Sequence, residues 1–229
     1  MRKCNLNNEN GRSMIEMLGV LAIIGVLSVG GIAGYSKAMM KYRINKTIEQ
    51  ITLIIANTQS FFTSQPDFTD LYFCSCYSTS YDKYDESKDV AKLIKKAKLF
   101  PDDIMEFDSD GNLIKANNAF GGSLLLEGDS TGAYIHIQSV PMEACIELAT
   151  YDWNNINGLI AVSVLGEAPQ NIKTSNVTKG CSGGTFAGVS SSVYACPNGT
   201  TIPVPIPLEK AIQACKSKEQ NIFAIKFTK

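Results

Sequence analysis

Histidine and tryptophan are nearly absent from this chain of 229 residues, which contains one of each. A serine or cysteine hydrolase needs a base beside its nucleophile. The single histidine, His136, lies in an alternating run that predicts a strand with this side chain facing solvent. An excess of basic charge is missing as well, because 21 Lys and Arg residues stand against 22 Asp and Glu residues, with a net charge of −1. We therefore expect that the protein is not an enzyme, has no cofactor and does not bind nucleic acid.

Charge is missing altogether from Met17 to Ala33, an apolar run about long enough to cross most of a bilayer as a helix. One carboxylate, Glu16, stands directly before it. An ionised carboxylate in hydrocarbon is costly unless it finds a partner, so we expect Glu16 to pair with an amine. The preceding leader, MRKCNLNNENG, differs from a secretory signal, because its polar residues come first and no A-x-A-like site follows the apolar run. Cleavage before the apolar run fits the sequence better.

The residues GRSMIE, followed by the apolar run, resemble the N-terminus of a type IV prepilin. In that family a prepilin peptidase cuts after the glycine and methylates the new N-terminus, and the glutamate pairs with the N-terminal amine of a neighbouring subunit. The resemblance implies cleavage after Gly11, N-methylation of Arg12 and an assembly role for Glu16. The family more often has Phe, Met, Leu or Val where this chain has Arg12.

Two other interpretations of the N-terminus are an uncleaved signal anchor and a secretory signal with a polar beginning, but neither explains Glu16. Basic residues follow the apolar run, and a charge rule alone would keep them on the cytoplasmic side, opposite to an exported head. The resemblance implies insertion by a dedicated route instead. These residues are Lys37, Lys41, Arg43 and Lys46.

The helix is expected to continue beyond the membrane segment. Apolar residues from Met40 to Phe62 recur at spacings of three and four, and no proline appears before Pro66. We predict one long helix over residues 12–64, with a transmembrane half at about 14–34 and an amphipathic half that packs on a head domain. Four glycines in the apolar half, at 25, 30, 31 and 34, favour close helix packing.

The remaining residues, 65–229, suffice for one head domain with a hydrophobic core. Together with the long helix they predict an α+β fold, in which an antiparallel β-sheet packs on that helix. Residues 66–84 are expected to form a surface loop and residues 169–206 an irregular insertion, and either stretch could carry adhesion. Strands are predicted at 112–115, 123–127, 133–138, 158–165 and 221–228, with the first three in a meander, and short helices at 86–98, 141–153 and 207–218.

Seven cysteines are present, and removal of the leader with Cys4 would leave six, an even number that favours disulfides in an exported domain. Zinc is the competing use, but Cys74-Ser75-Cys76 is one residue short of a C-x-x-C knuckle and no second pair has metal spacing. Residues 108–112, DSDGN, lack the offsets of a calcium loop and predict a hairpin turn. We expect no metal site.

Further along, AFGGSLLLEG followed by VPMEACIELA resembles the head of the type IVb subclass. In that subclass a head-helix cysteine is tied to one near the C-terminus, which implies the pair Cys145 with Cys215. Six cysteines allow 15 connectivities, and the sequence alone does not choose among them. With the implied pair in place, Cys181 with Cys196 would close the insertion, and Cys74 and Cys76 would bond to each other or stay a redox-labile couple.

The resemblance implies a structural subunit of a type IV pilus. Such a subunit is first held in the bacterial inner membrane, where it interacts with the prepilin peptidase and the assembly machinery. It then joins other pilin subunits in a surface filament for adhesion, aggregation or motility. A minor pilin or a type II secretion pseudopilin would share these features. A membrane-tethered extracytoplasmic binding domain is the other alternative, and Glu16 would be dispensable in it.

Overall fold

The computed structural model of the chain describes residues 12–69, 71–74, 91–111, 113–166, 192–197, 202–216 and 218–229. The chain divides into two compact units, Met1–Tyr42 and Arg43–Lys229. The expected leader at residues 1–11, with Gly11, lies outside the described residues. Most of the two expected loops at 66–84 and 169–206 also lies outside them.

The first element is α1, a helix of 51 residues from Arg12 to Phe62. It begins in the first unit and ends in the second, and the sequence predicted it to within two residues at its C-terminal end. The helix ends in a turn in which the Gln65 amide donates a hydrogen bond to the Phe62 carbonyl. Pro66 follows, and proline lacks the amide hydrogen that a further helical turn would need.

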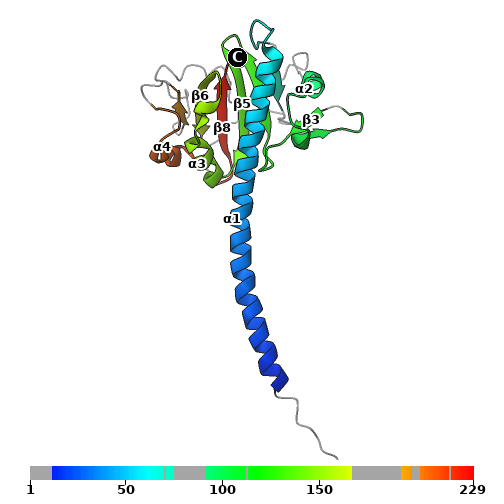
Figure 1. Cartoon of the computed structure of the whole chain (residues 1–229), viewed down its shortest axis with the longest axis vertical. Coiled ribbons are helices and arrows are strands. Elements are labelled where there is room, and N and C mark those ends of the chain that lie inside the picture. Colours follow the sequence, from blue (N-terminus) through cyan, green and yellow to red (C-terminus); the bar gives the residue numbers. More distant parts are fainter. Residues whose placement is uncertain are drawn as a thin grey trace, which may run out of the picture. The chain divides into compact units, whose positions relative to one another are not determined.

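In the second unit, α1 buries one stripe of side chains at spacings of three and four, as an amphipathic helix requires. The Phe62 ring lies 5.2 Å from the Phe68 ring, which in turn lies 6.3 Å from the ring of Phe227 in the sheet. Figure 1 shows this end of the helix, in cyan, crossing the sheet. The buried residues of the stripe are Ile44, Thr47, Gln50, Ile51, Ile54, Ile55, Thr58 and Phe62.

The head is built on a six-stranded sheet in which every pairing is antiparallel. The strand latest in the sequence, β8, lies between β5 and β6 at the centre, so the sheet is not a simple meander (Figure 1). In spatial order the strands are β1 (Tyr72–Cys74), β4 (Leu124–Asp129), β5 (Gly132–Val140), β8 (Asn221–Phe227), β6 (Leu159–Leu165) and β7 (Ser192–Ala195).

A separate two-stranded hairpin and several short helices complete the head. Residues 108–111 form the predicted turn between the two strands of the hairpin, with Gly111 at φ +76° and its amide donating to the Asp108 carbonyl. The remaining elements are β2 (Met105–Phe107), β3 (Leu113–Ala116), α2 (Ala91–Ala97), α3 (Met142–Thr150), α4 (Leu208–Ala214) and the 3-10 turns Asp102–Ile104 and Trp153–Asn155.

Three sequence predictions about the head were wrong. The strand predicted at 112–115 exists as β3, but it pairs with β2 instead of joining a meander with β4 and β5. The stretches predicted to be loop and insertion each contain a strand, β1 and β7. These strands are three and four residues long, too short for alternation to identify them.

Nearly every residue of the central strands is buried, so side chains on both faces of the sheet are out of contact with solvent. All seven residues of β8 are buried. Phe223, Ile225 and Phe227 lie on the face toward α1, and the side chains between them lie on the opposite face. His136 belongs to that opposite face and is 2% exposed, so the prediction of a solvent-facing histidine was wrong.

Candidate functional site

The first unit presents a continuous apolar surface. Its large apolar side chains, from Met14 to Tyr35, are between 52% and 76% exposed. The Ser28 hydroxyl in this stretch donates to the Ile24 carbonyl at 2.7 Å, which satisfies it without water. Within the part of the chain that the structure describes, α1 is the one helix that is long and apolar enough to cross a membrane, by length and composition. An apolar surface of this extent marks contact with lipid or with other helices.

Glu16 lies on this apolar surface, four residues after the first residue of α1. Four residues correspond to about one helical turn, so its carboxylate is about 6 Å along the axis from the start of the helix at Arg12. The expected cleavage point immediately precedes Arg12 and lies outside the described residues. The described geometry therefore places a single acidic side chain one turn from the end that processing would create.

In the head, Cys145 and Cys215 form a disulfide with an S–S distance of 2.01 Å and a Cα–Cα distance of 5.9 Å. This is the pair that the resemblance implied. Cys145 lies in α3, and Cys215 directly follows the last residue of α4, so the bond ties the two helices together beside the sheet. It encloses a long loop, because the two cysteines are 70 residues apart in the sequence.

Cys196 is also disulfide-bonded. Because Cys145 and Cys215 are bonded to each other, the partner of Cys196 lies elsewhere in the chain. Cys181 and Cys76 lie outside the described residues, and Cys74 ends β1. The pairs Cys181 with Cys196 and Cys74 with Cys76 therefore stay predictions.

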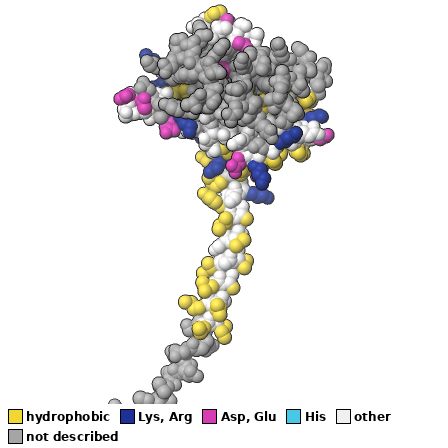
Figure 2. All heavy atoms as spheres, turned by 180° about the vertical axis from the view of Figure 1, so that it is seen from behind, with side chains coloured by type: hydrophobic (Ala, Val, Ile, Leu, Met, Phe, Trp, Pro, Cys, Tyr) yellow, Lys and Arg dark blue, Asp and Glu magenta, His cyan; other side chains and the backbone are white. Residues whose placement is uncertain are grey.

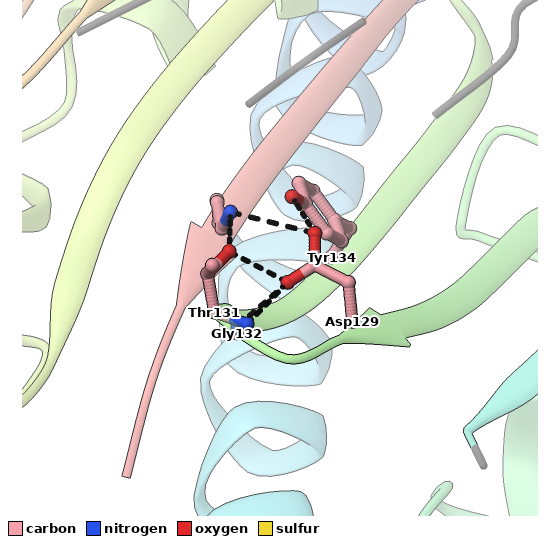
Figure 3. Close-up of polar contacts among 5 residues, drawn as sticks. Asp129, Thr131, Gly132 and Tyr134 are labelled. Carbon is pink, nitrogen blue, oxygen red and sulfur yellow. Dashed lines mark hydrogen bonds and ion pairs between the residues drawn. The ribbon is translucent and has the colours of Figure 1, made fainter. Parts of the chain in front are cut away.

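The sheet face opposite α1 carries a polar cluster around the turn from β4 to β5, shown in Figure 3. One oxygen of the Asp129 carboxylate accepts hydrogen bonds from the Thr131 amide, the Thr131 hydroxyl and the Gly132 amide at 2.6, 2.6 and 2.9 Å. The other oxygen accepts one from the Tyr134 hydroxyl at 2.6 Å and lies 3.7 Å from the Lys226 ammonium. That ammonium lies 4.5 Å from the centre of the Tyr134 ring. The cluster fastens β8 to the β4–β5 hairpin.

Burial and pairing act against each other on the pKa values of this cluster. Partial burial acts to raise the pKa of Asp129, but hydrogen bonds from Thr131 and Tyr134 and the charge of Lys226 outweigh it and lower that pKa. Burial lowers the pKa of Lys226, and Asp129 opposes this. Burial and the hydrogen bond to Asp129 raise the pKa of Tyr134. At neutral pH, Asp129 and Lys226 form an ion pair, and the neutral Tyr134 donates a hydrogen bond to the carboxylate of that pair.

His136 lies two residues from Tyr134 on the same face, and its Nε2 is buried without a hydrogen-bond partner. Burial lowers the pKa of His136 from 6.5 to about 4. The folded head therefore binds this proton less readily than the unfolded chain, and stability falls as the pH drops below 6.5. We expect the free energy of unfolding to fall by about 2 kcal/mol between pH 7 and pH 5 on account of His136.

Denaturant unfolding of the full chain in detergent, followed by Trp153 fluorescence, measures this effect. His136→Leu should remove most of the loss between pH 7 and pH 5, an interval in which carboxylates with lowered pKa values stay ionised. Equal pH dependence in the two proteins would show that His136 takes up its proton in the folded state as readily as in the unfolded state.

Among the described residues, no group of three or more His, Cys, Asp or Glu side chains is arranged to hold a metal ion. The sequence reasoning did not identify Asp129 and Lys226 as a linked pair. The signal was present, because Lys226 is the one charged residue in the apolar strand from Asn221 to Phe227. Its partner is remote in sequence and could be found only from the strand order.

A long N-terminal helix, apolar in its first part and packed on an antiparallel sheet in its second, defines a pilin-like protein. A family model described as PilS N terminal matches residues 41–193, and the chain belongs to this family. The resemblance to type IVb pilins is thereby confirmed, and pilins are structural proteins. A solved structure described as a type IV b pilin from Salmonella typhi is 12% identical, with alignment over 81% of this chain and 99% of that chain and a TM-score of 0.43. No curated protein matches the chain.

Proposed function

We propose that this pilin is a structural subunit of a type IV pilus. A prepilin peptidase would cleave it after Gly11 and methylate Arg12, and the assembly machinery of the inner membrane would add it to a surface filament that serves adhesion, aggregation or motility. The observation that supports this most is Glu16, one carboxylate on an otherwise apolar helical surface. A helix that served only as a membrane tether would gain nothing from this charge.

The proposed assembly step follows from the cost of that charge in lipid. Before assembly the Glu16 carboxylate lies at the edge of hydrocarbon, where a charge is costly to bury. Cleavage after Gly11 creates an amine on Arg12, and the amine of one subunit supplies a positive partner for Glu16 of the next. Because Glu16 is one turn from its own N-terminus, this pairing also fixes the axial step between neighbouring subunits.

In the filament, the apolar side chains from Met14 to Tyr35 would pack against those of neighbouring subunits and leave lipid. Gly30, Gly31 and Gly34 have open space where a Cβ atom would stand, so they allow neighbouring helices to approach closely. The carboxylate would select the partner and the register, and this helix packing would supply most of the cohesion. The head domains would then form the outer surface, on which any adhesive contacts are made.

The experiment is intact-mass analysis of the wild-type chain and of Glu16→Ala, in membranes and in filaments sheared from the cell surface. The wild-type chain in the sheared fraction should begin at Arg12 and carry one added methyl group. Glu16→Ala should enter the membrane normally, but its amount in the sheared fraction should fall by about thirtyfold or more. This factor corresponds to the roughly 2 kcal/mol or more lost when one partner of a buried ion pair is removed.

A matched control is Glu143→Ala, which removes an exposed carboxylate from α3 and should assemble like the wild type. Normal assembly of Glu16→Ala would eliminate the proposed role of this residue. A wild-type chain that keeps residues 1–11 and stays in the membrane would instead identify a membrane-tethered binding domain. Low abundance in filaments of correctly processed protein would identify a minor pilin or pseudopilin.

A further inference from the structure

The apolar surface of α1 ends in a short segment that the proposed assembly step does not use. Tyr35 and Tyr42 are 66% and 61% exposed. Lys37 and Lys41 lie between them and are exposed as well. We call these four residues the interface belt. In Figure 2 the yellow apolar side chains along the helix give way to dark blue basic side chains.

The length of the apolar run fixes where the interface belt would lie in a bilayer. Between Glu16 and Lys37 there are twenty residues, and none of them is Lys, Arg, Asp or Glu. Twenty helical residues span about 30 Å, which equals the thickness of the hydrocarbon core. With Glu16 at one edge of the core, Lys37 therefore lies at the other edge, at the level of the phosphate groups.

The belt residues are distributed around the helix as an interfacial anchor requires. Lys37 and Lys41 are four residues apart, so their side chains lie one above the other on one side of α1. Tyr35 and Tyr42 are seven residues apart, two turns along the opposite side. Tyrosine places its ring against acyl chains and its hydroxyl among headgroups, and lysine extends its ammonium to the phosphates. Both sides of the helix therefore match the chemistry of a lipid interface.

We propose that the interface belt binds anionic phospholipids, with Lys37 and Lys41 contacting their phosphate groups in the leaflet farther from Glu16. This inference rests on the membrane stage of the proposed function. It accounts for basic charge at a position where the usual charge bias of membrane proteins disfavours it. The lipid contact holds the subunit at a fixed depth until assembly, and it must be broken when the helix leaves the bilayer.

Lys46 lies one helical turn beyond Tyr42 on the same helix. The Lys46 ammonium lies 2.9 Å from the Asp103 carboxylate and 3.7 Å from that of Glu49, and its side chain is 30% exposed. It belongs to the second unit and is not a member of the belt. A lysine near an anionic membrane surface strengthens the association of a protein with that surface by a factor of about five. The two belt lysines together therefore predict a clear preference for anionic over uncharged phospholipids.

The test uses the full chain reconstituted in vesicles of phosphatidylcholine and phosphatidylglycerol. Spin-labelled lipids report how much phosphatidylglycerol is preferred over phosphatidylcholine at the protein surface. We expect the double variant Lys37→Gln/Lys41→Gln to lower this preference at least fivefold. The control Lys96→Gln/Lys210→Gln removes the same charge from exposed sites on α2 and α4 and should leave it unchanged. High salt, which shortens the screening length to about 3 Å at 1 M, should lower the wild-type preference in the same way.

Carbonate extraction of the same vesicles separates this inference from the proposed function. A double variant that resists extraction and keeps the wild-type lipid preference would overturn the lipid contact alone. If the double variant kept the wild-type lipid preference but lost cross-linking between copies, the belt would be assigned to acidic side chains of a second copy. That result would also overturn the lipid contact. Extraction of the wild-type chain would overturn the membrane stage of the proposed function, and this inference with it.

Discussion

Replacing both Cys145 and Cys215 by alanine is expected to lower the free energy of unfolding of the head by about 4 kcal/mol. The disulfide closes a loop of 70 residues. In the chain-entropy model, closing a loop of that length lowers the conformational entropy of the unfolded chain and so raises its free energy by about this amount. Alanine is preferable to serine here, because both cysteines are buried and a serine hydroxyl would need a hydrogen-bond partner. Such a loss is a large part of the 5–15 kcal/mol that is typical of a domain.

Trp153 supplies the measurement, because it is the one tryptophan in the chain and its ring lies 5.6 Å from that of Phe223 in β8. Denaturant unfolding of the full chain in detergent should show a lower midpoint for the double variant than for the wild type. The single variant Cys215→Ala should be destabilised by a similar amount, since it breaks the same bond. A change below about 1 kcal/mol would mean that the helices α3 and α4 are already held in the unfolded state.

Replacing Asp129 by alanine is expected to destabilise the head by about 3 kcal/mol. The substitution removes the acceptor of four hydrogen bonds and leaves the Lys226 ammonium, whose side chain is 4% exposed, without its carboxylate. Breaking a buried ion pair on one side costs about 3–5 kcal/mol. We expect the lower end of that range, because the Asp129 side chain is 36% exposed.

A double-mutant cycle isolates the ion pair from the rest of the cluster. In a Lys226→Met background, Asp129→Ala should cost at least about 1 kcal/mol less than in the wild type, because no buried ammonium remains. Asp110→Asn, at an exposed position in the β2–β3 turn, is the control and should change stability by no more than about 0.5 kcal/mol. Equal costs of Asp129→Ala in both backgrounds would assign its effect to the turn hydrogen bonds alone.

The long helix could be predicted from the sequence because its signals are local. The uncharged run after Glu16, the spacing of isoleucines from Ile44 onward and the first proline at Pro66 each depend on near neighbours in the chain. The observed end at Phe62 follows from the same signals. The general fold class followed as well, because alternating runs between glycine turns indicate an antiparallel sheet.

The strand order and the burial of the far face could not be predicted in this way. Alternation in Tyr134 to Gln138 showed which side chains share a face, but it could not show that both faces of the sheet are covered. His136 was therefore placed in solvent, whereas the structure buries it. The pairing of Asp129 with Lys226 could not be predicted for a similar reason, since the two residues are 97 positions apart in the sequence and only the position of β8 brings them together.

The candidate assembly residues are the opposite case. Glu16 could be singled out because a charge beside a long apolar run is conspicuous in any fold. Likewise, the pair Cys145 with Cys215 came from resemblance, and it is the pair in the structure. The described residues place Glu16 on the apolar helix, and its proposed partner is the N-terminal amine of a second copy.

Because β8 is a central strand and is also the last to be synthesised, the sheet is completed only at the end of synthesis. A chain that emerges stepwise from a ribosome or an export channel presents β5 and β6 early, while the strand that separates them is complete only at Phe227, 62 residues after Leu165. At usual synthesis rates this is an interval of about 3–12 s. Two strand edges stay open during that time, and open edges recruit other chains. We expect nascent chains of this pilin to need a chaperone until Phe227 has emerged, and chains truncated before β8 to be degraded.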